Sequence, residues 1–354
     1  FTIRSTLALY RLLNITLIVQ FWDISKFFDK ESLRDGMNSL YEAGIRGKLY
    51  RLWFELNKSS KIQITTGVGK SNLKEVGEII AQGSIGGALM SSLNLDNGVN
   101  KFFKGSTTEI CYGDIRLQPL IFQDDLARMS TSVEAAQEGN DKVAHVTNLK
   151  QLEINTEKSS YIIIGNSGAV NEIREMIKLT PLTLNNKVIK EKNSEKYLGD
   201  FIHNNGTNES TFQTVSDRYW RVMSSVLEIK TIVEDYRNKQ KGGIITGIEL
   251  WEMSVIPTIL NNAGTWNNTD TETYKKLNYL QNSLKRYLFS TPRSTPIPSL
   301  SWETGMLPMK YRIMIRKLCL TKHIMSLEDT SLAKDIFETQ IKFSFPKSLY
   351  YMKR

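Results

Sequence analysis

Three aspartates stand where an isolated carboxylate is costly. Asp23 ends the apolar run Ile15–Trp22, and Asp124 and Asp125 are adjacent between two short apolar runs. Neighbouring, partly buried carboxylates repel one another and lose solvation, so they need a cation close by. Mg²⁺ suits such sites, because a few carboxylates leave room for water and substrate phosphates. Two such ions can activate an attacking oxygen and stabilise a leaving one, so the aspartates predict phosphoryl-transfer chemistry.

Strands are expected to position these aspartates. The run Ile15–Trp22 is rich in β-branched residues and predicts a buried strand that ends at Asp23. The apolar runs 116–122 and 126–129 flank the other two aspartates and predict a tight hairpin. Further strands are predicted at 61–66, 161–164 and 197–202, and a further hairpin at 182–189 around Asn185-Asn186.

Helical spacing fills much of the remaining chain. It predicts helices over 33–40, 45–56 and 82–95, and about twenty residues from Ser132, with Asp29 expected to cap the first of them. Beyond Gly206 the pattern is almost wholly helical, interrupted only by the proline-rich stretch 291–298. Mixed strands and helices followed by helices alone predict an α+β domain and then an α domain. The expected boundaries are 1–205, 206–290 and 291–354.

Five short motifs in fixed order narrow the interpretation. Each is common by itself, and an Asp-Asp pair alone is more often a polar turn. Together they resemble the catalytic blocks of reverse transcriptases, in the same order and on the predicted elements. The motifs are Asp23–Asp29 (DISKFFD), Gln82–Ser84 (QGS), Phe122–Asp125 (FQDD), Leu152–Asn155 (LEIN) with Lys158-Ser159, and Tyr197–Gly199 (YLG).

This resemblance implies an α+β polymerase palm, an antiparallel sheet with packed helices, followed by an all-helical thumb. It implies an RNA-directed DNA polymerase that extends a DNA primer on an RNA template from dNTPs, using two Mg²⁺ ions or Mn²⁺. The implied residues are Asp23, Asp124, Asp125 and Lys158 as catalytic groups; Asp23, Ile24, Asp124 and Asp125 as metal ligands; Phe28, Gln82 and Gly83 at the nucleotide; and Tyr197, Leu198 and Gly199 as the primer grip.

Two of these residues have specific implied roles. An aromatic ring at Phe28 would exclude a ribose 2′-hydroxyl and so favour dNTPs, although a core aromatic is the alternative. Lys158 would protonate the pyrophosphate leaving group as a general acid, with a plain surface lysine as the alternative.

The later chain resembles the region after the polymerase core in non-LTR (LINE-like) retrotransposon proteins. The stretches Trp251–Trp266, Tyr274–Leu288 and Ser301–Pro308 carry this resemblance. The segment from Glu272 to Arg354 holds 15 Lys and Arg against 6 Asp and Glu, which equals the net charge of +9 for the whole chain. Such a segment can bind phosphates. The candidate contacts to the nucleic-acid backbone are Lys285, Arg286, Arg312, Arg316 and Lys317.

Composition argues against zinc-binding, disulfide-rich and membrane-spanning classes of protein. Cys111 and Cys319 are the only cysteines, and with three histidines they show no zinc-ligand spacing and no disulfide framework. No apolar run is long enough to span a membrane, so no membrane partner is expected. We expect an intracellular protein, in the nucleus or cytoplasm as a ribonucleoprotein.

Alternatives stay open at this point. A catalytically silent RNA-binding relic or domesticated domain would keep the fold without the reaction, although the three intact aspartates favour catalysis. Telomerase or an intron-encoded maturase would share the palm, but the tryptophan-rich region 251–266 argues against them. Phe27, Gln123 and Gly86–Ala88 depart from the usual motifs. Only about twenty residues precede Asp23, so most of the fingers and an endonuclease are expected elsewhere in a longer polypeptide, which leaves open whether the chain is active alone.

Overall fold

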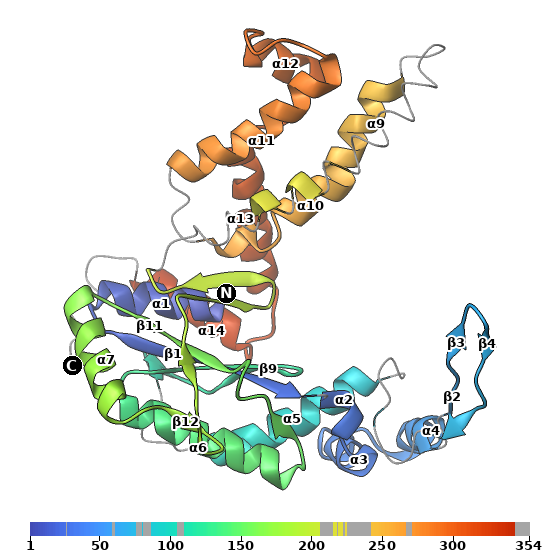
Figure 1. Cartoon of the computed structure of the whole chain (residues 1–354), viewed down its shortest axis with the longest axis vertical. Coiled ribbons are helices and arrows are strands. Elements are labelled where there is room, and N and C mark those ends of the chain that lie inside the picture. Colours follow the sequence, from blue (N-terminus) through green and yellow to red (C-terminus); the bar gives the residue numbers. More distant parts are fainter. Residues whose placement is uncertain are drawn as a thin grey trace. The chain divides into compact units, whose positions relative to one another are not determined.

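The computed structural model divides the chain into two compact units. It describes residues 1–25, 27–58, 61–75, 80, 86–104, 110–205, 215–217, 219–221, 224, 242–266 and 271–343. The sheet unit comprises residues 10–195, and the helical unit comprises residues 1–9 and 196–354. Figure 1 shows the elements of both, and each unit is described by itself.

The sheet unit is built around strand β1 (Leu17–Ser25). Two strands flank β1 antiparallel, and shorter strands pair with their outer edges or with the end of β1. Only the outermost pair, β11 with β14, is parallel. The partners are β9 (Asp125–Ser130), β8 (Leu120–Phe122), β11 (Ser160–Ile164), β14 (Lys190–Glu191) and β10 (Glu153–Ile154).

One face of this sheet packs against helices α5 (Gly87–Phe103), α6 (Val133–Leu149) and α7 (Ser167–Leu179) (Figure 1). Alternate residues of β1 point to this face, and Ile18 and Trp22 lie in the shared core. The residues between them, such as Val19, are buried as well. A strand buried on both sides explains why its sequence is a continuous apolar run rather than an alternating one.

One correction concerns the start of the second helix of this unit. After the short helix α2 (Phe27–Lys30), helix α3 (Leu33–Glu42) begins at the cap Ser32, not at Asp29. The Ser32 hydroxyl accepts a hydrogen bond from the Asp35 backbone N–H at 3.3 Å, which satisfies one of the free donors of the first turn. The prediction that Asp29 caps this helix is therefore wrong.

Residues 47–75 form helix α4 (Gly47–Lys58) and a ribbon of very short strands. The strand predicted at 61–66 is present in two pieces, β2 (Lys61–Ile62) and β3 (Thr65–Thr66). They pair with β5 (Lys74–Glu75) and β4 (Gly69–Lys70), and every residue of the ribbon is exposed.

The helical unit packs its helices around a second core that includes Trp251, Ile259 and Leu284. Helix α9 (Gly242–Leu250) runs through a wider, π-helical turn (Trp251–Val255) into α10 (Ile256–Ile259). Pro257 lacks an N–H and crowds the preceding turn, which accounts for this irregularity. The other described helices are α11 (Thr271–Phe289), α12 (Ile297–Thr304), α13 (Met309–Met325) and α14 (Leu332–Phe343), with α1 (Thr2–Leu12) contributing its first residues.

Residues 194–203 form a hairpin rather than the single strand predicted at 197–202. Strands β15 (Ser194–Tyr197) and β16 (Asp200–His203) are joined by Leu198 and Gly199, which have φ values of 48° and 77°. Positive φ at both central residues is typical of the tight turns that suit hairpin twist.

The fold class is thus as predicted, a mixed α and β unit with a sheet and packed helices, followed by helical elements. Among the described residues, no helix combines the length and apolar character that crossing a membrane requires.

Candidate active site

Asp23 and Asp125 face each other across neighbouring strands. The register of β1 and β9 pairs these two residues directly. Directly opposed residues of an antiparallel pair project to the same face of the sheet. Trp22 and Leu126 point to the helix-covered face, so alternation places both carboxylates on the opposite face.

Asp124 occupies the turn between β8 and β9. Phe122 pairs with Asp125, which leaves Gln123 and Asp124 as a two-residue hairpin loop. Gln123 has φ = 56°, a conformation that glycine adopts readily and other residues adopt at a cost. Strained backbone conformations of this kind concentrate at functional sites, and this one directly precedes Asp124 at the hairpin tip.

A loop after β10 fastens the backbone of Asp23, and the sequence motifs did not reveal this role. The Asp23 N–H donates to Ser159 Oγ at 3.2 Å, and the Asn155 N–H donates to the Asp23 carbonyl at 2.8 Å. Asn155 Oδ1 accepts from the N–H groups of Glu157 and Lys158, which closes the loop as an Asx turn. The Asn-X-Glu-Lys-Ser pattern is the only local signal for this anchor.

The same loop brings a cation to the carboxylates. Lys158 Nζ lies 3.8 Å from Asp23 Oδ2. Burial raises the pKa of Asp23, and the nearby Asp124 carboxylate raises it further, against the opposing charge of Lys158. The exposed Lys158 therefore does not fully offset the cost of placing the charged Asp23 carboxylate in a half-buried position beside Asp124.

The chemistry of these carboxylate donors is the kind that a hard divalent cation prefers. Asp23, Asp124 and Asp125 offer carboxylate oxygens at one end of the sheet, and Mg²⁺ needs only one or two carboxylates beside substrate phosphates and water. The Ile24 side chain is buried in the core, so only its carbonyl oxygen could serve as a ligand. Within the part of the chain that the structure describes, no group of three His, Cys, Asp or Glu side chains is arranged so that it could hold a metal ion by itself.

The predicted nucleotide contacts cannot be placed. Gln82 and Gly83 lie outside the described residues, as does the side chain of Phe28, whose backbone belongs to α2. The neighbouring Phe27 is buried in the core of the sheet unit, which suits an aromatic residue at this position.

The predicted primer grip forms the turn of the hairpin in the helical unit. Leu198 is 42% exposed, and its carbonyl accepts from Asn262 Nδ2 at 3.0 Å. On the following strand, Arg4 Nε donates to Asp200 Oδ2 at 2.6 Å, so α1 also holds the hairpin. These contacts fix Tyr197, Leu198 and Gly199 on a braced turn.

The candidate phosphate contacts divide into two groups. Lys285 lies inside the helical unit, only 1% exposed, and its Nζ donates to Ser301 Oγ at 2.8 Å, so we withdraw it as a phosphate contact. Arg286 Nη1 donates to the carbonyls of Pro292 and Thr295, both at 2.9 Å, and so braces the proline-rich stretch.

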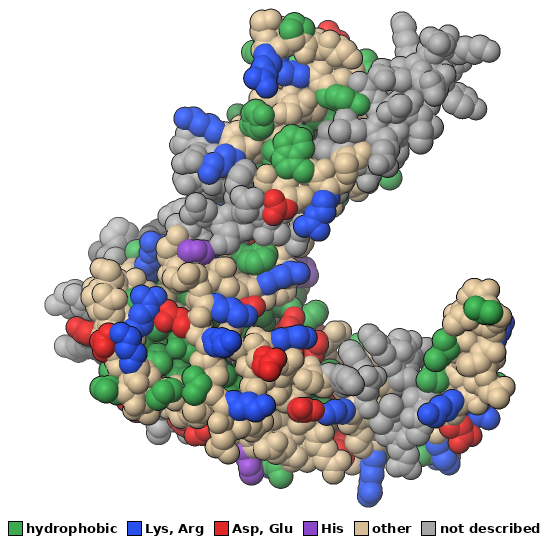
Figure 2. Space-filling model, viewed as in Figure 1, with side chains coloured by type: hydrophobic (Ala, Val, Ile, Leu, Met, Phe, Trp, Pro, Cys, Tyr) green, Lys and Arg blue, Asp and Glu red, His purple; other side chains and the backbone are tan. Residues whose placement is uncertain are grey.

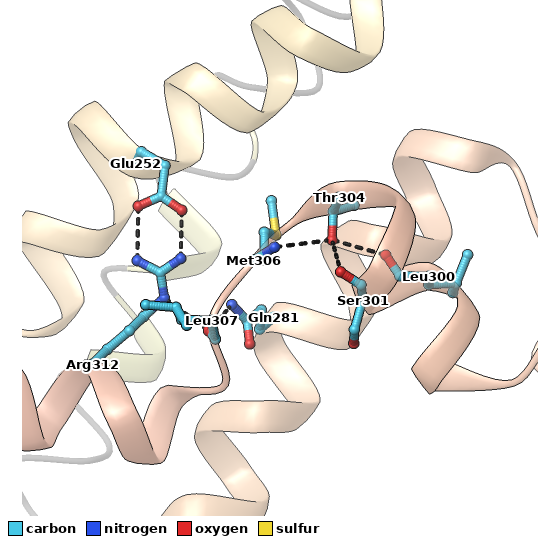
Figure 3. A network of polar contacts seen from close by, with 8 residues as sticks. All are labelled: Glu252, Gln281, Leu300, Ser301, Thr304, Met306, Leu307 and Arg312. Carbon is cyan, nitrogen blue, oxygen red and sulfur yellow. Dashed lines mark hydrogen bonds and ion pairs between the residues drawn. The ribbon is translucent and has the colours of Figure 1, made fainter.

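Arg312 is also engaged inside the unit. Its guanidinium donates to both carboxylate oxygens of Glu252, from Nη1 at 2.7 Å and from Nη2 at 2.5 Å (Figure 3). Arg316 is exposed on α13 and Lys317 is half-buried beside it, so these two remain as candidates. Figure 2 shows Lys and Arg side chains over the region of α11 and α12 as well as over the sheet unit.

The stretch Ser301–Pro308 forms the bend between α12 and α13. Thr304 ends α12, its hydroxyl donates to the Leu300 carbonyl at 2.8 Å, and the Met306 N–H donates back to that hydroxyl (Figure 3). Gly305 turns the chain with φ = 62°, and Met306 enters the core. This motif is therefore a helix-to-helix connection in the structure.

Comparisons with known proteins give only distant similarity. No family model and no curated protein matches the chain. It is similar to telomerase from Candida albicans in complex with a TWJ fragment of telomeric RNA, at 10% identity and a TM-score of 0.44, over 86% of this chain and 53% of that one. Telomerase from Candida tropicalis is similar with its TWJ fragment (10%, TM-score 0.39, 95% and 50% covered) and in the apo form (9%, 0.41, 85% and 55%). The chain spans about half the length of these proteins, and the scores are too low to establish a shared fold.

Proposed function

We propose that this chain is the palm and thumb of an RNA-directed DNA polymerase of the non-LTR retrotransposon kind. The observation that carries the proposal is the meeting of Asp23 and Asp125 across β1 and β9, with Asp124 at the hairpin tip and Lys158 beside Asp23. The ordered reverse transcriptase motifs support it, because all of these residues belong to those motifs. The full activity and its intracellular ribonucleoprotein setting are parts of the same proposal.

The chain's own residues have distinct tasks in this reaction. Asp23, Asp124 and Asp125, with the Ile24 carbonyl, would hold two Mg²⁺ ions, which supply charge for the attacking and leaving oxygens of an in-line displacement. The primer 3′-hydroxyl loses its proton to solvent and attacks the α-phosphorus of a dNTP, so that a new P–O bond forms and the bond to pyrophosphate breaks. The anchor from Asn155 and Ser159 keeps Asp23 fixed while charge builds up.

Lys158 is suited to the leaving group. Its ammonium lies 3.8 Å from the Asp23 carboxylate, and it would give a proton to the departing pyrophosphate oxygen. Its side chain is 70% exposed, so the ion pair contributes little to stability.

Replacing Lys158 with Gln should therefore slow nucleotide addition about 100-fold and leave the free energy of unfolding within about 0.5 kcal/mol of the parent. Single-turnover primer extension and urea unfolding measure the two effects. Exposed Lys187, on β13 (Lys187–Val188) and outside this loop and the motifs, provides the matched control Lys187→Gln, expected to change neither quantity. An unchanged rate in Lys158→Gln would remove the general-acid assignment.

The proposal as a whole is tested by primer extension on an RNA template with dNTPs and Mg²⁺. The chain is compared with the same chain carrying Asp124→Asn. Extension by the parent alone establishes a metal-dependent reverse transcriptase. No extension by either protein, with RNA still bound, favours instead a silent RNA-binding domain.

A further inference from the structure

Helix α13 is apolar on two opposite faces. One face, with Met309, Ile313 and Ile324, is buried. The other face carries five large apolar side chains that are between 47% and 64% exposed: Tyr311, Met314, Ile315, Leu318 and Met325. With the α-helical repeat, these five positions fall within a sector of about 100° that points away from the buried residues. A surface helix normally turns polar side chains outward, so this outer apolar stripe indicates a contact with another molecule.

The spacing of the outer stripe suits a second helix. Tyr311, Met314, Leu318 and Met325 follow one another at intervals of three, four and seven residues. Helices that pack side by side use this repeat, and a helix that binds in a groove anchors itself at the same intervals. From Tyr311 to Met325 the stripe is about 21 Å long at the α-helical rise, which matches a partner helix of about four turns.

The charges on α13 favour an acidic partner. The helix holds five Lys and Arg and no Asp or Glu. Lys322 interrupts the outer stripe between Leu318 and Met325, and Lys310 lies beside its other end. Both lysines are exposed, and neither pairs with a carboxylate among the residues that the structure describes. Carboxylates on a partner would supply the complementary charge and would steer its approach.

Other occupants fit this face less well. A second copy of the chain would bring the same basic helix to the contact, where like charges repel. Nucleic-acid backbones are bound mainly through cations and polar groups, and the outer stripe has such a group only at Lys322. A helix that lies on a membrane turns a strongly polar face to water, whereas the face of α13 behind the stripe is buried.

We infer that the outer stripe of α13 docks an acidic amphipathic helix of a partner protein. The apolar side chains of that helix pack along the stripe, and carboxylates at its edges pair with Lys310 and Lys322. Such a site is additional to the proposed polymerase function, because it uses neither the site aspartates nor a nucleotide. Arg316, a candidate phosphate contact, lies about 160° around the helix from Leu318 and stays available.

A synthetic peptide tests the apolar half of the site. The probe is a fluorescent helical peptide of about four turns with Leu along one face and Glu at both edges, and a scrambled peptide of the same composition is the control ligand. In fluorescence anisotropy with the whole chain, the amphipathic peptide should bind at least about tenfold more tightly than the scrambled one. Leu318→Asp should remove about tenfold of that affinity, because it places a carboxylate in the centre of the stripe. The matched control is Leu179→Asp at the exposed end of α7, which should leave the Kd unchanged.

Charge reversal tests the electrostatic half. Lys322→Glu should weaken binding of the Glu-edged peptide about tenfold and strengthen binding of a Lys-edged peptide by a similar factor. Lys187→Glu, an exposed lysine on β13, is the matched control and should change neither affinity. Because Leu318 and Lys322 are exposed, both variants should fold as the parent does, which circular dichroism and urea unfolding check.

Several results would overturn the inference. Equal affinity for the amphipathic and scrambled peptides would remove the docking site. A parent dimer in analytical ultracentrifugation that Leu318→Asp makes monomeric would assign the stripe to a second copy. Binding to an RNA–DNA duplex, or to phosphatidylserine vesicles, that Leu318→Asp abolishes while peptide binding persists would assign the stripe to nucleic acid or to a membrane. None of these measurements requires nucleotide addition, so a failure of the proposed polymerase function would leave the result for α13 unaffected.

Discussion

Replacing Asp23 with Asn is expected to slow nucleotide addition about 1000-fold or more and to leave the metal-free protein at least as stable as the parent. The rate falls because a main oxygen ligand of the proposed ions is lost, and metal charge is worth several kcal/mol in the transition state. Stability does not fall, because the carboxylate is half-buried beside Asp124 and its charged form is disfavoured in the folded chain. Single-nucleotide extension rates and urea unfolding in a chelator measure the two effects.

The stability effect has a defined pH dependence. Burial holds the pKa of Asp23 above its ordinary value of 3.8, so the folded state binds this proton more tightly than the unfolded state does. The parent then loses stability as pH rises through 3.8 and the higher folded-state pKa, whereas Asp23→Asn does not. The stability difference should therefore appear toward neutral pH and vanish below 3.8.

An exposed aspartate of the same unit provides the control. Asp114 is exposed in the turn between β6 (Ile110–Tyr112) and β7 (Ile115–Leu117) and belongs to none of the motifs. Asp114→Asn should change neither the rate nor the pH dependence. A metal-free Asp23→Asn protein that is clearly less stable than the parent would mean that the Asp23 carboxylate stabilises the fold.

The strands that carry the three aspartates could be predicted from sequence because their signals are local. An apolar run ending in Asp23 and two short apolar runs around Asp124 and Asp125 are sufficient to place a strand and a hairpin. The pairing of β1 with β9 follows less directly, since it depends on contacts more than a hundred residues apart. The ordered motifs supplied this long-range information, which periodicity alone does not contain.

The errors have tertiary causes. Lys285 has the helical spacing of a surface lysine, but Ser301, on α12, gives its ammonium a partner inside the unit. Aspartate and serine are both favourable N-cap residues, and only the observed start of α3 at Leu33 shows that Ser32 is the cap. The anchoring of Asp23 by Ser159 was not predicted because the Asn155–Ser159 pattern indicates a local turn but does not reveal which distant N–H the hydroxyl binds.

On the face of β1 opposite the aspartates, one buried amide side chain bonds two residues of the strand. Asn140, on α6, is fully buried, and its Oδ1 accepts from Gln20 Nε2 at 2.7 Å and from Trp22 Nε1 at 2.9 Å. Gln20 also donates to the Ala136 carbonyl at 2.9 Å, so it keeps one bond without Asn140. If Asn140 is replaced by a residue without an acceptor, the Trp22 indole N–H loses its partner in an environment without water, where an unpaired donor costs free energy.

Asn140→Ala should therefore lower the free energy of unfolding of the sheet unit by about 3 kcal/mol, from one orphaned indole N–H and a cavity beneath β1. Asn97→Ala is the matched control, because Asn97 is exposed on α5 and bonds Glu42 at 3.2 Å in contact with water; we expect a change within about 0.5 kcal/mol. Urea unfolding followed by hydrogen exchange at the β1 amides measures both. Equal losses would contradict the prediction, whereas a loss confined to Asn140→Ala would show that this buried amide fixes the strand on which Trp22 precedes Asp23.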